Sequence, residues 1–302
     1  MLDQVIVIGG GLAGVSAAHT ALEHGARVVL LDKSPYCGGN STKATSGLNA
    51  CVTKTQIAKG VADSVEAFEK DTVLSANLGK EYKPYPLARV LTEDSAPAVE
   101  WLTSKFKIDL SLVSRLGGHS FPRTHRGKER FPGMTITYGL LEKLEEIEKN
   151  TNGKQARIIN KAMANKLITD KDNNVIGVEY LNLKDKKTYK EYGIVVICSG
   201  GFAADFTKDS LLMKYRPDLG HMPTTNGAHC TGDGIKMCQE VGAELVDMEW
   251  VQTHPTGLVQ PSDPENKVKW LAAEALRGCG GIIINANGER FCDELGRRDY
   301  VS

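Results

Sequence analysis

The sequence lacks the features that mark several large classes of protein. No apolar run among its 302 residues approaches the roughly 20 residues that a membrane-spanning helix needs. Lysine plus arginine and aspartate plus glutamate both number 37, so the charge gives no reason to expect binding to nucleic acid or to an anionic membrane. Internal repeats and low-complexity segments are also absent. The sequence therefore indicates a globular protein of one or two domains with a sizeable core.

The cysteines lack the pattern of a disulfide framework or a zinc site. They are odd in number and form no C-x-x-C pair, and His229 beside Cys230 has no further ligands to complete a site. The seven cysteines stand at positions 37, 51, 198, 230, 238, 279 and 292. We expect no bound metal, and a soluble protein in a reducing compartment, either the cytoplasm or an organelle matrix. No signal or transit peptide is visible, so either the protein is made without one or the numbering begins inside a longer chain.

The strongest motif that is present lies within residues 1–32. Residues 4–8 are apolar and β-branched, as in a strand that is buried on both faces. The turn Gly9–Gly14, a helical stretch over residues 15–23 and a second apolar run over residues 26–31 follow directly. Glycine-rich turns are common, but a G-x-G-x-x-G turn between a strand and a helix predicts a dinucleotide site.

The residues of this turn fit a pyrophosphate. Gly9 allows the tight turn, Gly11 lets backbone N–H groups approach the phosphates, and Gly14 lets the helix pack on the strand. Leu12 and Ala13 lie at the N-terminus of the helix, where unpaired N–H groups and the helix dipole favour an anion.

The segment that follows is predicted to contact the same cofactor. Asp32 lies 21 residues after Gly11, where a carboxylate can hold ribose hydroxyls. Residues 33–49 are small and polar, which favours a loop whose backbone closely approaches a ligand, although a plain flexible loop has the same composition. The candidate contacts in this loop are Lys33, Gly38, Gly39, Asn40, Ser41, Ala44, Ser46 and Gly47.

The middle of the chain is predicted to be largely helical. Residues 55–110 have this character, and one helix over residues 94–106 begins at an Asp-Ser cap with a proline in its first turn. Residues 138–149 carry apolar side chains at helical spacing, which is typical of a helix packed on the core. Between them, the His- and Arg-rich segment 117–126 fits a solvated basic loop as well as a functional one.

A meander of antiparallel strands is predicted after the last of these helices. Strands over residues 158–159 and 166–169 are followed by an alternating run over residues 175–183 and a returning strand over residues 188–192. Residues 193–201 then form another buried strand that stops on small residues. A parallel sheet, a meander and this return strand favour a flavin domain over a nicotinamide domain. The candidate cofactor contacts at the strand end are Ser199 and Gly200.

A second cluster of backbone donors is predicted before a helix over residues 235–241. The turn Thr231–Gly234 precedes this helix and suits an anionic or carbonyl-bearing ligand. A simple helix N-cap by the Asp233 side chain explains the same residues. The candidate contacts in this region are Thr225, Asn226, Gly232 and Asp233.

These motifs resemble the FAD domain of fumarate reductases. The matching segments are residues 9–14, 38–41, 199–201 and 231–234. Four later segments resemble the active-site segments of soluble single-chain fumarate reductases of the flavocytochrome-c and eukaryotic NADH-linked types. They are Gln252–Thr256, Ala273–Gly278, Gly288–Phe291 and Arg297–Asp299.

The resemblance implies a fold and a domain organisation. The fold is α/β, with a Rossmann-like FAD-binding domain of the glutathione-reductase type with a β-meander, followed by the start of an α+β capping domain. The FAD-binding domain would span residues 1–248 and the cap residues 249–302. Because the family continues well beyond Asp299, the chain would end inside the cap, before a further histidine and arginine that bind the second carboxylate of the substrate. Such a fragment is expected to bind flavin poorly and to be inactive.

The resemblance also implies an activity, the reduction of fumarate to succinate by hydride transfer from N5 of FAD. His254 resembles the residue that holds one carboxylate of fumarate, and Arg298 resembles the proton donor. Glu274 and Arg277 resemble the relay that reprotonates this arginine. Forked, cationic donors suit a dianionic substrate.

Two departures from the family pattern affect these expectations. Quinol-linked relatives attach FAD covalently through a histidine, and the matching position here is Ser41, so we expect non-covalent FAD. Ala273 stands where some bacterial relatives place a threonine against the substrate, which predicts weaker substrate binding unless another group compensates. From the residues alone, Arg298 is explained more simply by a salt bridge with Asp299 or Glu294.

Other activities share these motifs. An L-aspartate oxidase or another unsaturated-acid reductase of the superfamily has the same flavin segments, whereas a ketosteroid dehydrogenase would have tyrosines in place of the His and Arg set. A non-catalytic flavin-binding or electron-transfer module is the alternative from a different class. The electron donor is left open between NADH acting through another domain, a reduced flavin and a haem domain.

Overall fold

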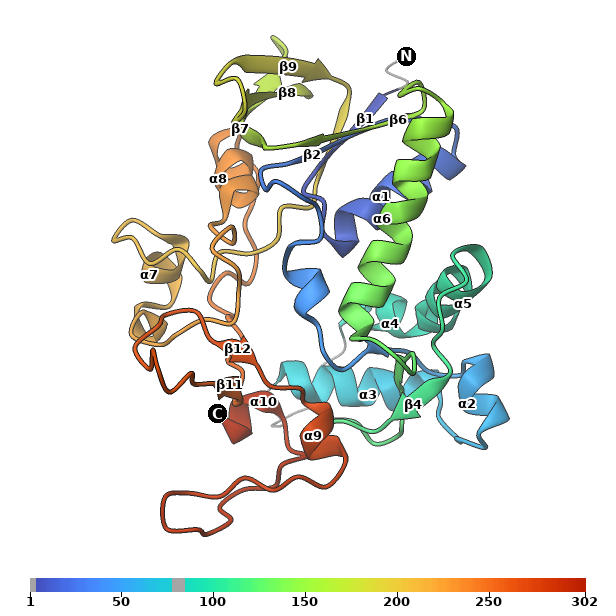
Figure 1. Cartoon of the computed structure of the whole chain (residues 1–302), viewed down its shortest axis with the longest axis vertical. Coiled ribbons are helices and arrows are strands. Elements are labelled where there is room, and N and C mark those ends of the chain that lie inside the picture. Colours follow the sequence, from blue (N-terminus) through green and yellow to red (C-terminus); the bar gives the residue numbers. More distant parts are fainter. Residues whose placement is uncertain (1–3, 78–84) are drawn as a thin grey trace. The chain divides into compact units, whose positions relative to one another are not determined.

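A computed structural model describes residues 4–77 and 85–302, which fall into two compact units (Figure 1). Unit 1 consists of the described parts of residues 1–42, 136–251 and 261–269. Unit 2 consists of the described parts of residues 43–135, 252–260 and 270–302. This grouping does not test the assignment of residues 1–248 to a FAD-binding domain and of 249–302 to a cap, which stays a prediction.

Unit 1 contains a four-stranded parallel sheet in the order β10-β1-β2-β6. Its strands are β1 (Gln4–Ile8), β2 (Arg27–Asp32), β6 (Ala156–Asn160) and β10 (Ile194–Ile197). The apolar run of β1 is buried, with Ile6 and Val7 both at 0% exposure, as expected for a strand covered on both faces. The predicted strand–helix–strand unit is confirmed from Gln4 onward, and the first three residues of that prediction lie outside the described part of the chain.

Two helices lie beside this sheet in unit 1 (Figure 1). Helix α1 (Leu12–Glu23) follows the glycine turn, and helix α6 (Pro132–Asn150), whose residues 132–135 belong to unit 2, contains the predicted apolar stripe. The ring of His19 in α1 is buried, and its Nε2 lies 2.8 Å from the backbone oxygen of Leu140 in α6. Leu140 and Leu144 are fully buried, which confirms that this face of α6 packs on the core.

The meander forms a separate three-stranded antiparallel sheet in unit 1, in the order β7-β8-β9. Its strands are β7 (Ala162–Thr169), β8 (Val175–Asn182) and β9 (Thr188–Tyr192). The assignment of residues 158–159 to the meander is wrong, because these residues belong to β6 and pair with β2 in the parallel sheet. The core of unit 1 forms where buried side chains of the two sheets meet Met237 of helix α8 (Asp233–Glu240).

The remaining elements of unit 1 are short. They are η1 (Gly39–Lys43), whose last residue belongs to unit 2, α7 (Leu211–Tyr215) and η2 (Pro217–Leu219).

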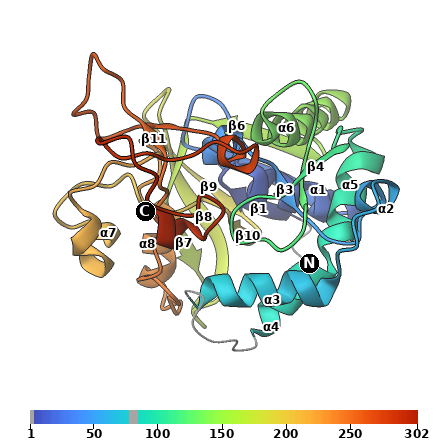
Figure 2. The ribbon, with the colours of Figure 1, turned by 90° about the horizontal axis from the view of Figure 1, so that it is seen from below.

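Residues 55–110 of unit 2 are largely helical in their described part, as predicted. The first helices of this unit are α2 (Lys54–Ala58), α3 (Val65–Ala76), α4 (Pro86–Glu93) and α5 (Ser95–Lys105). Helices α3 and α4 pack side by side (Figure 2), and residues 78–84 of the predicted helical region are outside the described residues. Helix α5 matches the predicted helix over residues 94–106, and Asp94 stands at its N-cap position as expected. The side chain of Asp94 makes no capping hydrogen bond, and Ser95 Oγ donates to the backbone oxygen of Thr92.

Short strands and helices complete unit 2. One sheet has the order β3-β5-β4, and β11 pairs with β12. The elements are β3 (Leu48–Asn49), β4 (Leu112–Ser114), β5 (Thr124–Arg126), β11 (Gly257–Leu258), β12 (Trp270–Leu271), α9 (Ala275–Gly278) and α10 (Arg298–Val301).

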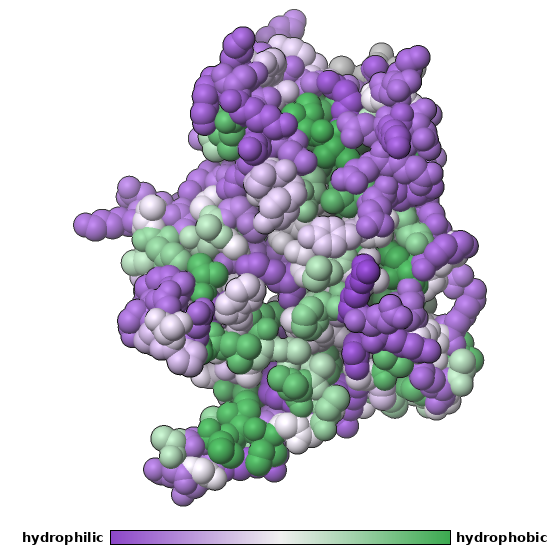
Figure 3. All heavy atoms as spheres, viewed as in Figure 1, coloured by the Kyte–Doolittle hydropathy of each residue, from purple (hydrophilic) through white to green (hydrophobic). Residues whose placement is uncertain are grey.

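The interpretation of residues 117–126 as a solvated basic loop is wrong. Arg123 and His125, which supply much of its basic character, are both at 0% exposure. By contrast, the segment after α9 leaves large apolar side chains at the surface, and Figure 3 shows apolar surface in that region. Ile282, Ile284 and Phe291 are each more than half exposed there.

Candidate cofactor site and candidate acid site

Unit 1 contains a cavity of about 470 Å³ at the carboxyl ends of its parallel strands. The glycine turn lines it from one side, and the end of β10 and the start of α8 line it from others. The turn needs glycine at Gly14, because a Cβ there would lie 1.8 Å from the backbone oxygen of Gly9. Ligands of open α/β sheets bind at this end of the strands, so the cavity is the candidate cofactor site.

Asp32 lines this cavity, and two backbone amides hold its carboxylate. Gly10 N donates to its Oδ2 and Ser34 N donates to its Oδ1, both at 2.8 Å. Each carboxylate oxygen keeps a second lone pair, so the group can still accept hydroxyl hydrogen bonds from a ribose. The fixed orientation of Asp32 fits the role predicted from its spacing.

A lysine and an aspartate form a second polar wall of this cavity. Lys33 Nζ donates to Asp233 Oδ2 at 2.5 Å and to Thr231 Oγ1 at 2.8 Å. Burial raises the pKa of Asp233, but Lys33 and Thr231 outweigh it and hold that pKa below its ordinary value. The alternative interpretation of Asp233 as an N-cap is wrong, because Gly232 is the N-cap of α8, in the left-handed conformation, and Asp233 is the first helical residue.

Twelve of the predicted cofactor contacts line this cavity. They are Gly9, Gly11, Leu12, Ala13, Asp32, Lys33, Gly39, Asn40, Ser41, Ser199, Gly200 and Asp233. Asn226 acts one step away, because Asn40 Nδ2 donates to its Oδ1 at 2.7 Å. Gly14, Gly38, Thr225 and Gly232 are in unit 1 but are not among its lining residues. Ala44, Ser46 and Gly47 belong to unit 2.

One observation in this cavity points directly to a missing partner. Ser199 Oγ is buried and has no hydrogen-bond partner among the described residues. Buried hydroxyls are normally paired, so an orphaned hydroxyl on the wall of a cavity fits a site built for a polar ligand. Sequence reasoning missed other lining residues, including Ala162 and Ala164 on β7 and His229. The alternation of small residues on β7 was the available signal.

In unit 2, Glu274 and Arg298 form a paired acid and base. Glu274 is 5% exposed, and its Oε2 accepts from Arg298 Nη2 at 2.7 Å and from Arg298 Nε at 3.1 Å. The free arm of Arg298, Nη1, donates to Gln252 Oε1 at 2.9 Å. Burial raises the pKa of Glu274, but the Arg298 guanidinium, with further help from Arg277 and from Gly117 N, holds it below its ordinary value.

The simpler explanation of Arg298, a salt bridge with Asp299 or Glu294, is wrong. Asp299 pairs with Arg297, at 3.2 Å from its Nε, and Glu294 pairs with Arg290 at 2.7 Å. Arg298 therefore forms its salt bridge with the residue that the resemblance implied, Glu274. Gln252 is the contact of Arg298 that sequence reasoning did not assign to a role.

Arg277 is buried beside the same pair with most of its donors unused. Its side chain is 5% exposed, and Nη1 donates to the backbone oxygen of Glu294 at 2.6 Å. Its Nη2 lies 3.9 Å from Glu274 Oε1, and neither Nε nor Nη2 has a hydrogen-bond partner among the described residues. Such a group can donate to a water, a ligand or a shifted carboxylate without any rearrangement of the backbone.

His254 is held as a neutral donor near these charges. Burial and the Arg298 guanidinium lower the pKa of His254 to about 4, although Glu274 acts in the opposite direction. Thr256 N donates to its Nδ1 at 3.3 Å, so the neutral ring carries its proton on Nε2. The imidazole can therefore donate one hydrogen bond at neutral pH without carrying a charge.

A second cavity, of about 520 Å³, lies in unit 2, and the ion pair of Glu274 and Arg298 forms part of its wall. Glu274, Arg298 and Gln252 line it, together with Ser46 and Gly47 from the cofactor-contact prediction. Among the described residues no group of three or more His, Cys, Asp or Glu side chains could hold a metal ion.

Comparison with known proteins identifies relatives of the whole described chain. The model of a family described as "FAD binding domain" matches residues 4–302. The chain is 47% identical to a fumarate reductase of Schizosaccharomyces pombe over 99% of this chain and 58% of that protein. It is 40% identical to fumarate reductase 1 of Saccharomyces cerevisiae over 100% of this chain and 63% of that protein. A solved open conformation of a flavocytochrome c3 fumarate reductase superposes with a TM-score of 0.80 at 32% identity, covering 99% of this chain and 50% of that chain.

The chain thus spans between half and two thirds of the length of these relatives. Across residues 4–77 and 85–302, none of the helices combines the length and the apolar character that crossing a membrane would require.

Proposed function

We propose, from the premise that this chain belongs to the FAD binding domain family, that the whole protein is an FAD-dependent enzyme that reduces fumarate to succinate. Family membership confirms FAD as the cofactor and the predicted Rossmann-like α/β fold. The observation that carries the proposed activity is the ion pair between buried Glu274 and partly exposed Arg298 at the wall of a cavity.

The FAD would be held in unit 1 by the residues that line its cavity. The glycine turn would face the pyrophosphate, Asp32 the ribose hydroxyls, and Ser199 would gain the partner that it lacks. When bound, FAD supplies the hydride for reduction of the double bond. We propose that it is bound non-covalently, because Ser41 offers a hydroxyl that already accepts from Leu12 N at 3.0 Å.

Arg298 is the proposed proton donor to the substrate carbon. Free guanidinium is a very weak acid, with a pKa above about 12, so it can donate only as negative charge develops on the carbon beside it. Arg298 would then be reprotonated through Glu274, whose Oε2 already lies 2.7 Å from Arg298 Nη2. Arg277, with two unused buried donors, would stabilise the relay carboxylate as the proton moves.

His254 is the proposed contact for one carboxylate of fumarate. A neutral Nε2–H can donate to a carboxylate oxygen, and its neutrality avoids a third positive charge beside Arg298 and Arg277. Ala273 offers no hydroxyl at the position before Glu274, so substrate affinity would depend on His254 and on residues beyond this chain. Electrons would reach FAD from a donor outside the described residues, such as NADH acting through another domain, a reduced flavin or a haem domain.

Acceptor specificity tests this proposal. The longest natural version of the chain, reconstituted with FAD and supplied with a chemical electron donor under anaerobic conditions, should convert fumarate to succinate. Monocarboxylic acids such as acrylate and crotonate should react far more slowly, because they lack the second carboxylate. Formation of hydrogen peroxide from L-aspartate in air, without fumarate reduction, would replace the proposal with an aspartate oxidase. Bound flavin that reacts with none of these acids would indicate a non-catalytic module.

A further inference from the structure

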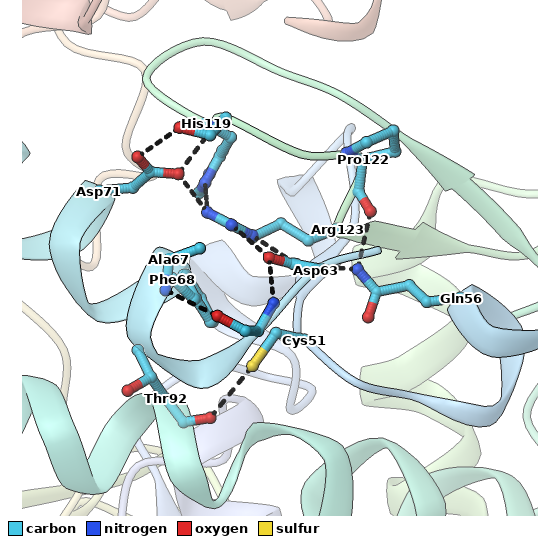
Figure 4. Close-up of polar contacts among 12 residues, drawn as sticks. Cys51, Gln56, Asp63, Ala67, Phe68, Asp71, Thr92, His119, Pro122 and Arg123 are labelled. Carbon is cyan, nitrogen blue, oxygen red and sulfur yellow. Dashed lines mark hydrogen bonds and ion pairs between the residues drawn. The ribbon is translucent and has the colours of Figure 1, made fainter. Parts of the chain in front are cut away.

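A second buried charge cluster lies in unit 2 and plays no part in the proposed chemistry (Figure 4). The side chain of Arg123 is at 0% exposure and lies between two carboxylates. Its Nη2 and Nε donate to Asp63 at 2.7 and 2.9 Å, and its Nη1 donates to Asp71 Oδ2 at 2.6 Å. The guanidinium also lies over the ring of Phe68, 4.6 Å from its centre.

Both carboxylates accept from Arg123, Asp63 through two hydrogen bonds and Asp71 through one, and their other partners differ. Asp63 accepts from Gln56 Nε2 and from Ser64 N, both close to α2 and α3. Asp71 accepts from Ser120 N at 2.7 Å and from Ser120 Oγ at 2.8 Å, and so anchors the end of the loop over residues 116–120. Of the two carboxylates, Asp71 is the one that bonds to this loop, and Arg123 itself reaches the loop through His119 Nδ1, 3.2 Å from its Nη1.

The other end of that loop contacts Glu274, the partner of Arg298. Gly117 N donates to Glu274 Oε1 at 3.1 Å, and Gly118 N donates to the backbone oxygen of Leu295 at 3.0 Å. The approach is close enough to require glycine, because a Cβ on Gly117 would lie 2.7 Å from the backbone oxygen of Gly296 and 3.1 Å from Glu274 Oε1. The loop thus holds one carboxylate oxygen of Glu274 while Arg298 binds the other.

We infer that Asp71 is a positioning residue for Glu274, acting through the loop over residues 116–120. Asp71 fixes Ser120, the loop then presents Gly117 N to Oε1, and Oε2 is left oriented toward Arg298. A carboxylate held by two opposed donors keeps the orientation that a proton relay needs. The inference deepens the proposed function and rests on it for its effect on turnover, but the effect on Glu274 itself can be measured without flavin or substrate.

Several charged or titratable groups surround Glu274, and none of them changes its charge near pH 7. The guanidinium groups of Arg298 and Arg277 face Glu274, and His254 is neutral at pH 7 because its pKa lies at about 4. On the loop, burial and Arg123 lower the pKa of His119, whose Nδ1 lies 3.2 Å from Arg123 Nη1. Arginine can only donate, so His119 accepts there and stays neutral.

The matched test compares Asp71→Asn with Asp63→Asn in the longest natural version of the chain. Each variant removes one of the two charges that neutralise Arg123, and Asp63 makes the larger number of hydrogen bonds to it, so a purely structural role predicts an effect at least as large in Asp63→Asn. If Asp71 acts through the loop, Asp71→Asn should raise the titration midpoint of the Glu274 carboxyl carbon, followed by ¹³C NMR, and Asp63→Asn should raise it much less. The rate of fumarate reduction should fall about tenfold more in Asp71→Asn than in Asp63→Asn, which corresponds to about 1.4 kcal/mol for one charge-assisted hydrogen bond.

Two further variants keep the inference testable if either aspartate variant fails to fold. Ser120→Ala changes an exposed residue and removes one of its two hydrogen bonds to Asp71. Gly117→Ala forces the loop away from Glu274 at the opposite end. Both should move the Glu274 midpoint in the same direction as Asp71→Asn, Gly117→Ala by more than Ser120→Ala.

The outcomes separate this inference from the proposed function. Equal midpoints in Asp71→Asn and Asp63→Asn, or no shift in Gly117→Ala, would overturn the positioning role. A shifted Glu274 midpoint in a protein that does not reduce fumarate would keep the positioning role and overturn the proposed function instead.

Discussion

Two buried arginines in unit 2 differ in how far their donors are used. Arg123 is at 0% exposure and uses all three of its nitrogens, on Asp63, Asp71 and His119. Arg277 is at 5% exposure and makes one short hydrogen bond, through Nη1, while Nε and Nη2 have no partner in the described part of the chain. The first arrangement is complete, and the second leaves donors available.

The difference separates a group that supports the fold from a group that is kept ready for a reaction. An unsatisfied buried donor costs about 1–3 kcal/mol, and such costs are retained mainly at functional sites. Arg277 lies next to Glu274 and Arg298, where a proton is proposed to move. Arg123 has its full set of bonds and holds Asp71, the residue inferred to position Glu274 through the loop over residues 116–120.

The largest effect on turnover is expected from replacing Arg298. This replacement tests whether Arg277, Glu274 and Arg298 form the reactive cluster. In the longest natural version of the chain, Arg298→Ala should reduce fumarate turnover by at least about 10²- to 10⁴-fold and leave FAD bound, because the proposed acid is lost. The measurements are the rate of succinate formation and the flavin absorbance of the purified protein. Retained turnover would remove Arg298 from the mechanism.

The next effect is the loss of protein stability when each of the two buried arginines is replaced. Arg123→Met should lower the free energy of unfolding by about 3–5 kcal/mol, because Asp63 and Asp71 would stay buried without their cation. Arg277→Met should change it by about 1 kcal/mol or less, because Glu274 keeps Arg298 and two unsatisfied donors disappear. Urea unfolding curves of both variants give these values. A larger loss in Arg277→Met would contradict the comparison.

A smaller effect follows from the lowered pKa of His254. The unfolded state takes up a proton near pH 6.5, whereas the folded state does so only near pH 4, so this group lowers the stability as the pH falls from about 6.5 toward 4. Above pH 6.5 it has no such effect. His254→Gln should therefore lose less stability than the parent protein over this window, as measured by the melting temperature at each pH. Parallel curves for the two proteins would show that His254 titrates normally.

The smallest effect concerns the cofactor cavity of unit 1. Ser199→Ala should leave the stability of the flavin-free protein unchanged and weaken FAD binding by about 1 kcal/mol, because its orphaned hydroxyl would bond only to the cofactor. Ser210→Ala is the matched control, since Ser210 Oγ accepts from Met213 N as the N-cap of α7. That variant should cost about 1 kcal/mol of stability and leave FAD affinity unchanged. Fluorescence titration with FAD and urea unfolding distinguish the two.

The sequence predicted the features that depend on neighbours along the chain. The glycine turn, the flanking strands and α1 follow from apolar runs and glycine spacing within about 30 residues, so their positions could be predicted closely. The burial of Arg123 could not be predicted, because its partners Asp63 and Asp71 lie 60 and 52 residues away. A basic segment of the same composition would be exposed if those two aspartates were elsewhere.

The candidate acid site was reached by resemblance and not by spacing. Glu274 and Arg298 are 24 residues apart, and nothing local distinguishes that pairing from the nearer Asp299. The support from the loop over residues 116–120 escaped prediction for the same reason, since Gly117 is 157 residues from Glu274. Contacts of this kind are set by how the elements of unit 2 pack together.

The most direct test of the account is the anaerobic reaction of the reduced flavin with fumarate. The longest natural version of the chain is loaded with FAD and reduced, fumarate is added without oxygen, and the return of the oxidised flavin spectrum is followed. Rapid and complete reoxidation is expected, with one succinate formed for each flavin. A flavin that is bound and reduced, but stays reduced in the presence of fumarate, would contradict it.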